Sequence, residues 1–258
     1  MNNTTEFGPG RFGNHLIRNM ALHILAERYD LKFKFSYHDE IKKMGINLFT
    51  EGTMEYGNND KIIINDSNFM KYINSKTKIN KNICVAPSMY AQTEEFVLYL
   101  KKYCETNGIF KSVIETNKFK ERYNVNNDLF IHVRIGDVPQ YTPPYSYYSS
   151  IIEKIDYTNG FISSDSIDSD LCKKLIKTYN LEIIDLSEND TILFASTCKY
   201  LILSQGTFSW AMGFFSINST VYFPKIKHPW HGNIFVFPEW NEVDYNYNDK
   251  VIEQNTLK

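Results

Sequence analysis

The sequence predicts an α/β protein with a mostly parallel sheet of the Rossmann-like class in its C-terminal half. From Leu129 onward, short apolar runs alternate with longer stretches of helical period, and strands that alternate with helices form parallel sheets through right-handed crossovers. Polar residues follow these apolar runs, at the sheet edge where open α/β folds bind ligands. The chain has 258 residues, which allows one large domain or two small ones. We place a boundary at the polar run before Leu129, which divides the chain into residues 1–128 and 129–258.

Each element of the C-terminal half is expected from its hydrophobic pattern, with short apolar runs as strands and residues of helical period between them. The expected strands are Leu129–Val133, Gly160–Ser163, Glu182–Leu186, Tyr200–Ser204 and Thr220–Phe223. The expected helices lie near Tyr145–Ile155, Asp168–Tyr179, Asn189–Cys198 and Phe208–Ile217. The tail after Trp240 is polar, so we expect it to be loose.

The N-terminal half has a less regular pattern. Apolar residues at helical spacing predict a helix from Asn14 to about Tyr29. Aromatic residues alternate with polar ones over Lys32–Tyr37, which predicts a strand. Further apolar runs stand at Ile62–Ile64 and Ile83–Ala86, and further helical stretches lie near Asn68–Ile73, Glu94–Cys104 and Lys111–Arg122.

Composition excludes several classes of protein. The formal net charge is −2, and a nucleic-acid-binding protein usually carries a basic excess, so we expect no nucleic-acid partner. The four cysteines form no C-x-x-C pair, which argues against a structural metal site or a disulfide framework. No apolar run approaches the roughly 18 residues of a membrane span, and the first residues do not resemble a signal peptide. We therefore expect a soluble cytoplasmic protein with reduced thiols.

The polar residues after the C-terminal strands predict a phosphate-binding crevice. Arg134-Ile135-Gly136-Asp137 follows the first strand, Ser164-Asp165 follows the second, and Ser204–Ser209 follows the fourth. Small hydroxyl residues and a glycine before a helix suit a phosphate, and an arginine adds a bidentate cation. The alternative is that Asp165, Asp168, Asn189 and Thr207 are helix N-caps, although Arg134 is not a capping residue.

Two further motifs allow more than one interpretation. Gly8–Gly13 matches G-x-G-x-x-G, but a dinucleotide fingerprint needs a strand before it, and only a short polar leader precedes this one. We expect its glycines to let helix-start amides approach a ligand, the alternatives being a dinucleotide site or a tight turn without ligand. Asp168-Ser169-Asp170 matches a metal-binding D-x-D, yet acids that open a helix also stabilise its dipole, and we favour this capping role.

Five segments resemble, in order, the motifs of the α1,2-fucosyltransferases and the related protein O-fucosyltransferases. Gly10–His15 resembles their G-R-L/F-G-N-Q start, and His132–Asp137 resembles H-V-R-R-G-D. Pro144–Tyr148 is similar to P-x-x-Y-Y, Phe161–Asp165 to F-S-D-D, and Cys198–Trp210 to C-K-H-x-I-x-S-N-S-T-F-S-W-W. The collinear match runs from Gly10 to about Trp240, which is nearly the whole chain.

The resemblance implies a GT-B-type fold of two facing Rossmann-like domains that transfers fucose from GDP-fucose to a glycan hydroxyl. It implies an inverting reaction, with an α1,2 linkage, that needs no metal or other cofactor. The implied catalytic residues are Arg134, on the phosphates, and Asp137, which orients the guanidinium. The implied donor-binding residues are Gly10, Arg11, Phe12, Gly13, Asn14, His132, Arg134, Ser164, Asp165, Thr207, Phe208 and Ser209. Among them, Asn14 and its glycines would reach the fucose and diphosphate, His132 the nucleoside, Asp165 the guanine or its neighbourhood, and Thr207, Phe208 and Ser209 the phosphates.

The chain departs from the family pattern at several of these positions. Ile135 stands where the family has a second arginine, and Ser164-Asp165-Ser166 keeps one acid of a pair. Loss of a cation near the diphosphate leaves three rival interpretations open. These are the same fold with another nucleotide sugar, a metal-dependent sugar transferase that uses Asp168 and Asp170, and a glycan- or nucleotide-binding member that has lost turnover.

Overall fold

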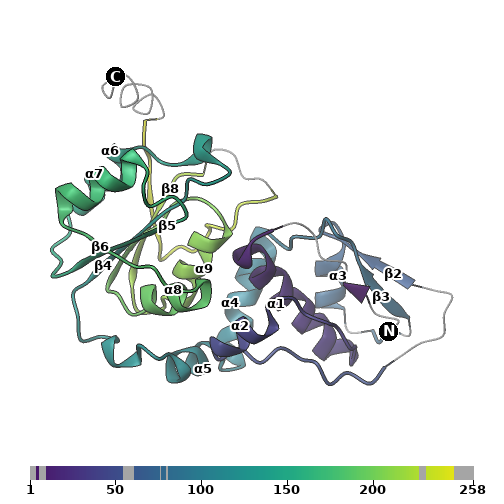
Figure 1. Cartoon of the computed structure of the whole chain (residues 1–258). Coiled ribbons are helices and arrows are strands. Elements are labelled where there is room, and N and C mark those ends of the chain that lie inside the picture. The colour runs from purple at the N-terminus through teal and green to yellow at the C-terminus, as the bar shows by residue number, and fades with distance from the viewer. Residues whose placement is uncertain are drawn as a thin grey trace. The chain divides into compact units, whose positions relative to one another are not determined.

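The computed structural model of the chain describes residues 4–5, 10–54, 61–75, 77–79, 81–226 and 231–246. The chain divides into two compact units, each with its own parallel sheet (Figure 1). The N-terminal unit comprises residues 1–116 and 229–234, and the C-terminal unit comprises residues 117–228 and 235–258. Residues 117–128, which the sequence-based boundary assigns to the first domain, thus group with the second unit.

The N-terminal unit contains a three-stranded parallel sheet in the order β1-β3-β2 among the residues described. Its strands are β1 (Thr4–Thr5), β2 (Lys61–Ile64) and β3 (Asn82–Val85), and its helices are α1 (Phe12–Tyr29), α2 (His38–Lys43), α3 (Phe69–Asn74), α4 (Glu94–Thr106) and α5 (Ile109–Thr116). Helix α1 is buried along almost its whole length and on all sides. A helix of this kind is held by neighbours on several faces, so its glycine-loop end has a position set by packing.

Two expectations for the N-terminal half are wrong. Phe33 and Phe35 are buried while Lys32 and Lys34 are exposed, as the alternation requires, but Lys32–Tyr37 contains no strand. A strand needs a paired neighbouring backbone as well as an alternating face, and the chain forms only an isolated bridge beside this segment. The leader before the glycine loop does contain a strand, because β1 pairs in parallel with β3. A polar two-residue strand has no hydrophobic pattern to reveal it.

The C-terminal unit contains a six-stranded parallel sheet in the order β6-β5-β4-β7-β8-β9 within the described part of the chain. Its strands are β4 (Leu129–Val133), β5 (Gly160–Ser164), β6 (Glu182–Ile183), β7 (Tyr200–Ile202), β8 (Thr220–Pro224) and β9 (Asn241–Val243). Its helices are α6 (Tyr145–Ile152), α7 (Asp170–Tyr179), α8 (Glu188–Ala195) and α9 (Thr207–Phe215), with short 3-10 turns η1 (Lys120–Arg122) and η2 (Pro139–Tyr141). Every strand and helix expected here from the sequence is present, which confirms the α/β class with a mostly parallel sheet.

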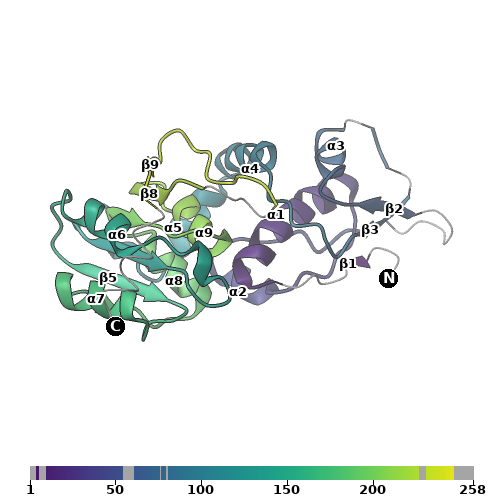
Figure 2. The same cartoon turned by 90° about the horizontal axis from the view of Figure 1, so that it is seen from above.

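Alternate residues of the central strand β4 face opposite helical layers. Ile131 and Val133 belong to a core shared with α6 and α7. Phe130 faces the other way, toward Phe194 of α8, with ring centroids 6.1 Å apart. Figure 1 shows α6 and α7 on one side of this sheet and α8 and α9 on the other, and Figure 2 gives the view from above. His132 therefore lies on the α9 side, where the site described below is built.

The segment after Trp240 is not loose up to the last residue described. It forms β9, which pairs in parallel with β8, and Tyr245 beyond it is buried. The Trp240 ring lies so close to Gly213 of α9 that a Cβ there would meet it at 2.7 Å, which only glycine avoids. The pattern was missed because this edge strand is polar and short.

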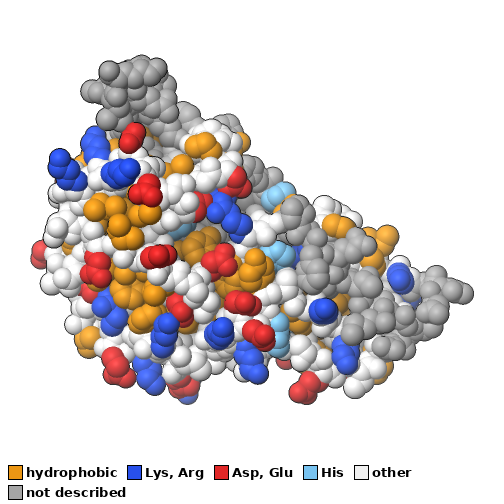
Figure 3. Space-filling view, viewed as in Figure 1, with side chains coloured by type: hydrophobic (Ala, Val, Ile, Leu, Met, Phe, Trp, Pro, Cys, Tyr) orange, Lys and Arg blue, Asp and Glu red, His pale blue; other side chains and the backbone are white. Residues whose placement is uncertain are grey.

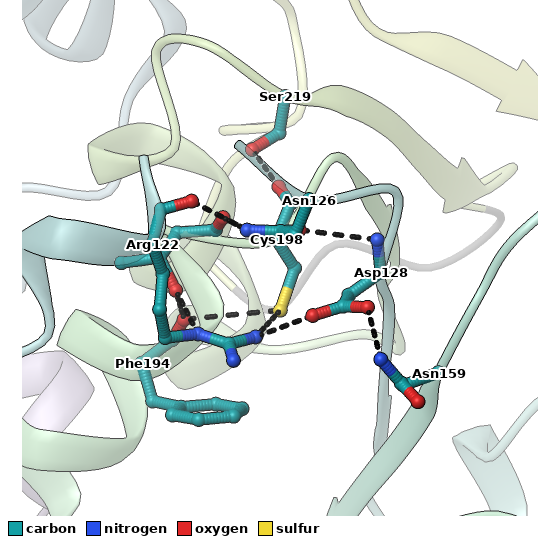
Figure 4. Close-up of polar contacts among 8 residues, drawn as sticks. Arg122, Asn126, Asp128, Asn159, Phe194, Cys198 and Ser219 are labelled. Carbon is teal, nitrogen blue, oxygen red and sulfur yellow. Dashed lines mark hydrogen bonds and ion pairs between the residues drawn. The ribbon is translucent and has the colours of Figure 1, made fainter. Parts of the chain in front are cut away.

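Residues 117–128 are held to the C-terminal unit by Arg122 (Figure 4). Its guanidinium bonds Asp128 at 2.8 Å and lies over the Phe194 ring, 4.5 Å from the centroid. Asp128 also accepts a hydrogen bond from Asn159 at 2.9 Å, and its side chain is 3% exposed. The Arg122 side chain is 29% exposed, so the pair is only partly buried, and these contacts link the segment to Asn159 and Phe194 of the second unit.

In the described residues, no helix is long and apolar enough to cross a membrane. All four cysteines are free thiols. Burial raises the pKa of the Cys198 thiol to about 12, against the opposing effect of the nearby Arg122 cation. Lys, Arg, Asp and Glu side chains are interspersed on the face of the C-terminal unit seen in Figure 3.

Candidate functional site

The carboxyl ends of β4 and β5 bring Arg134 and Asp165 together. The two strands are parallel neighbours in which Val133 lies opposite Ser164, so the next residue of each emerges at the same edge of the sheet. Arg134 Nη1 donates a hydrogen bond to Asp165 Oδ2 at 2.8 Å. The Ile135 N–H donates to Asp165 Oδ1 at 2.9 Å. Both oxygens of this carboxylate therefore hold the loop that follows β4.

Asp137 contacts the other end of the same guanidinium. Arg134 Nη2 lies 2.5 Å from Asp137 Oδ1, so one cation stands between two carboxylates. The Arg134 side chain is 17% exposed, while that of Asp137 is 68% exposed. The Arg134 carbonyl accepts a hydrogen bond from Thr142 Oγ1 at 2.6 Å, which fixes the backbone of the loop as well.

His132 joins β4 to the first turn of α9. Its Nδ1 lies 2.6 Å from Ser209 Oγ, and both side chains are buried. Its ring packs edge-on against Phe208, with centroids 5.3 Å apart. These contacts hold the amino end of α9 at the carboxyl edge of β4. His132 stands two residues before Arg134, so the helix end and the arginine share this edge.

The amino end of α9 has the features of an anion-binding helix terminus. Gly206 is its N-cap with φ 101° and ψ 163°, a conformation available essentially to glycine alone. Thr207 and Phe208 open the first turn, which carries no acidic residue. The first N–H groups of a helix have no partner within it, and the macrodipole adds partial positive charge, so they attract a phosphate.

None of the four residues expected as alternative N-caps, Asp165, Asp168, Asn189 and Thr207, occupies an N-cap position. Ser169 caps α7 by accepting a hydrogen bond from the Cys172 N–H at 3.3 Å, and Ser187 and Gly206 precede α8 and α9. Asp165 pairs with Arg134 instead. Asp170 lies in the first turn of α7, as its dipole role requires. No group of three His, Cys, Asp or Glu side chains suited to a metal occurs among the residues described.

The glycine loop of the N-terminal unit leads directly into α1. Gly8 and Pro9 lie outside the described residues, Arg11 is the N-cap, and Phe12 and Gly13 are buried in the first turn. A Cβ on Gly10 would lie 2.8 Å from Asn14 Nδ2, so glycine is needed there for the side chain of Asn14. Asn14 Oδ1 accepts a hydrogen bond from Gln92 at 3.0 Å.

His15 ties the loop to the segment after α1. Its Nε2 lies 3.1 Å from the Gly10 carbonyl and its Nδ1 lies 2.7 Å from Ser36 Oγ. Burial lowers the pKa of His15, although its bond to the Gly10 carbonyl acts in the opposite direction. The imidazole is therefore mainly neutral at neutral pH, and its two hydrogen bonds link Gly10 to Ser36.

Sequence reasoning missed Gln92 and Thr142 as supports of the predicted site residues. Gln92 stands 78 positions from Asn14, and neither residue lies in a motif that ties it to its partner. Close by Gln92 along the chain, the Tyr90 ring stacks on His231 with centroids 3.7 Å apart. This stack brings two sequence-distant parts of the N-terminal unit together, and no pattern in the sequence near either residue predicts it.

A pocket of about 260 Å³ lies at the opposite, amino-terminal edge of the C-terminal sheet. Among its lining residues, Asn126 bonds the backbone of Arg122 and Thr197, and Ser196 bonds the Leu193 carbonyl. Figure 4 shows Asn126 and Cys198 in this network. These polar groups are already paired within the protein, and the loops before parallel strands are not where α/β folds bind nucleotides. We place the candidate site at the carboxyl edge instead.

Three solved structures are similar to the chain over most of its length. The fucosyltransferase NodZ from Bradyrhizobium is 10% identical with a TM-score of 0.48, over 82% of this chain and 91% of its own. POFUT1 in complex with GDP is 12% identical with a TM-score of 0.46, over 95% and 99%. POFUT1 in complex with GDP-fucose is 12% identical with a TM-score of 0.44, over 84% and 96%. No family model matches the chain, and no curated protein is similar to it.

Proposed function

We propose that the chain is a fucosyltransferase of the GT-B type that moves L-fucose from GDP-fucose to a hydroxyl of a glycan. We propose an inverting, metal-independent reaction that forms an α1,2 linkage, carried out by a soluble cytoplasmic protein. The observation that carries the proposal is the presence of Arg134 and the amino end of α9 at one carboxyl edge of a parallel sheet. The five collinear motifs supply the identity of the donor.

The chemistry of the proposed reaction requires stabilisation of a leaving diphosphate. The oxygen of an acceptor hydroxyl attacks the anomeric carbon and gives up its proton to solvent, the bond from that carbon to the diphosphate oxygen breaks, and GDP leaves with the electron pair. Arg134 offers a planar cation, and the N–H groups of Thr207 and Phe208 offer helix-start donors. Together they replace the charge that a metal ion supplies in other sugar transferases.

The remaining residues have supporting roles in this proposal. His132 is fixed through Nδ1 by Ser209, which orients its other ring nitrogen. Asn14, held by Gln92, contributes an amide from the glycine loop to the fucose and diphosphate. We propose that the N-terminal unit binds the acceptor, and we assign this role to no particular residue.

A donor screen tests the proposal. We expect GDP to raise the melting temperature more than UDP and dTDP do. At a free GDP concentration near 100 Kd, the free energy of unfolding should exceed that of the protein without ligand by roughly 2–3 kcal/mol. We expect product release from GDP-fucose with a glycan acceptor, measured by the GDP formed above the rate in the absence of acceptor. Equal shifts with GDP and UDP, or turnover of a uridine donor alone, would contradict the proposed donor.

A second candidate function is a nucleotide- or glycan-binding member without turnover. The observation that favours it is the pairing of the single arginine with two carboxylates, combined with Ile135 at the position of the second arginine. GDP binding without release of fucose to any acceptor identifies this case. Transfer at rates above spontaneous hydrolysis of the donor excludes it.

A further inference from the structure

The side chains that pair Arg134 with Asp165 are partly shielded from water, whereas the side chain of Asp137 is largely exposed. The side chains of Arg134 and Asp165 are 17% and 19% exposed, and that of Asp137 is 68% exposed. An exposed ion pair contributes little because water and salt screen it. The two carboxylates that contact this guanidinium therefore differ. Asp165 holds it more strongly, and Asp137 is more easily displaced by another anion.

Asp165 is also the only one of the two that reaches across strands in the contacts described. It follows β5 and bonds both the Arg134 side chain and the Ile135 N–H, which follow β4. Asp137 belongs to the same loop as Arg134, at i+3. A bond between two adjacent strand ends fixes the guanidinium relative to the sheet, whereas a bond within one loop moves with the loop.

The use of both oxygens bears on the role that the resemblance implies for Asp165. A carboxylate that recognises guanine accepts the N1–H and an N2–H at its two oxygens together. In Asp165, Oδ1 accepts from a backbone N–H and Oδ2 accepts from a cation, and both donors belong to the loop after β4. Guanine would have to share each oxygen with a donor that is already in place.

This inference rests on the proposed function and deepens it. We propose that Asp165 is a positioning residue that presents Arg134 to the donor diphosphate, and that Asp137 is the anion that the diphosphate displaces from Arg134 Nη2. Asp165 thus acts on the donor through Arg134 and not by contact with the guanine base. The anchored guanidinium loses less side-chain freedom when it binds phosphate, which strengthens binding.

A double-mutant cycle on GDP affinity tests the role of Asp165. Asp165→Asn keeps an oxygen that accepts the Ile135 N–H but removes the charge that holds Arg134. We expect it to weaken GDP binding roughly 10- to 100-fold, the range for a lost hydrogen bond to a charged group, when affinity is measured well below the melting temperature of the variant. In the Arg134→Ala background we expect the same substitution to change the Kd by less than about twofold, because its target is gone.

Two further measurements separate positioning from base recognition. We expect the ratio of GDP to UDP affinity to be the same in Asp165→Asn as in the wild-type protein. We expect kcat to fall along with GDP affinity, and Asp165→Glu to restore part of both. Asp156→Asn, which makes the same charge change at an exposed site elsewhere in the C-terminal unit, serves as the matched control. We expect its GDP affinity to equal that of the wild-type protein.

Asp137→Asn tests the exchange at Nη2. Removal of this exposed carboxylate leaves the diphosphate one negative charge fewer to displace, so we expect GDP to bind about threefold more tightly at low salt. Weaker binding of GDP by this variant would overturn the assignment of Asp137 as the displaced anion.

The outcomes distinguish this inference from the function on which it rests. An equal loss from Asp165→Asn in both backgrounds, a reduced GDP-to-UDP ratio, or no loss at all overturns the positioning role while GDP binding stands. Failure of the wild-type protein to bind GDP overturns the proposed function itself and the inference with it.

Discussion

Gly206→Ala perturbs the amino end of α9 through the backbone alone. Gly206 has φ 101° and ψ 163°, and a Cβ added to it would meet no atom within 4 Å. The substitution therefore introduces no clash, and its cost is that of holding a residue with a Cβ in a region of φ and ψ that only glycine normally occupies. Such a conformation costs about 1–3 kcal/mol.

The expected effect on stability follows from that cost. At about 2–4 °C per kcal/mol for a chain of this size, the melting temperature should fall by roughly 2–12 °C if the backbone keeps its conformation. If it relaxes instead, the peptide between Gly206 and Thr207 rotates and the helix-start N–H groups change direction. If the backbone relaxes, we expect GDP to bind about tenfold more weakly, because helix-terminal donors act only when they point at the phosphate.

Gly108→Ala is the matched control for this experiment. Gly108 also has a positive φ, 67°, and also has no atom within 4 Å of an added Cβ, but it lies between α4 and α5 in the N-terminal unit. We expect it to lower the melting temperature and to leave the GDP Kd unchanged. Calorimetric titration with GDP and thermal melts on both variants measure the two effects. Wild-type GDP affinity in Gly206→Ala at an unchanged melting temperature, which would show that the backbone has relaxed, would refute the assignment of α9 as a phosphate site.

The other predictions concern the cation, the metal, the glycine loop and pH. Arg134→Ala should lower kcat/KM about 10²–10³-fold with the fold retained, and Arg134→Lys should restore little because an ammonium lacks the planar fork; near-normal transfer with a reduced melting temperature would make Arg134 a loop anchor. Activity should survive EDTA, and loss that Mn²⁺ restores would support the Asp168–Asp170 metal site. Gln92→Leu removes the partner of Asn14 and should raise the donor KM about fivefold, the equivalent of about 1 kcal/mol, in steady-state assays; an unchanged KM would separate Asn14 from donor binding. Burial lowers the pKa of His23 below 6.5, so the unfolded chain takes up a proton more readily than the folded one, and stability should fall as the pH drops below about 6.5. Thermal melts from pH 7.5 to 5 should show a smaller fall in melting temperature for His23→Gln than for the wild-type protein. An identical fall would show that His23 does not cause the pH dependence.

The pattern of side chains predicted the C-terminal unit well because its central strand is buried on both faces. Leu129–Val133 is apolar except for His132 and buried at every position, and its neighbours along the chain carry helical periods that require crossovers. The same reasoning failed at one edge of each sheet. Strands β1 and β9 are short and polar, and Lys32–Tyr37 has an alternating face without a partner strand.

The sequence by itself determined that polar residues gather at the carboxyl ends of parallel strands, because topology places every such end at the same edge. It thereby placed Arg134, Asp165 and the start of α9 at a common edge. Only the tertiary structure decided which of these residues hold one another. Arg134 and Asp165 stand 31 positions apart and meet through the register of β4 with β5, which no local pattern encodes. A hydrogen bond of this kind depends on ångström-scale distances between strand ends, and packing of the whole unit sets those distances.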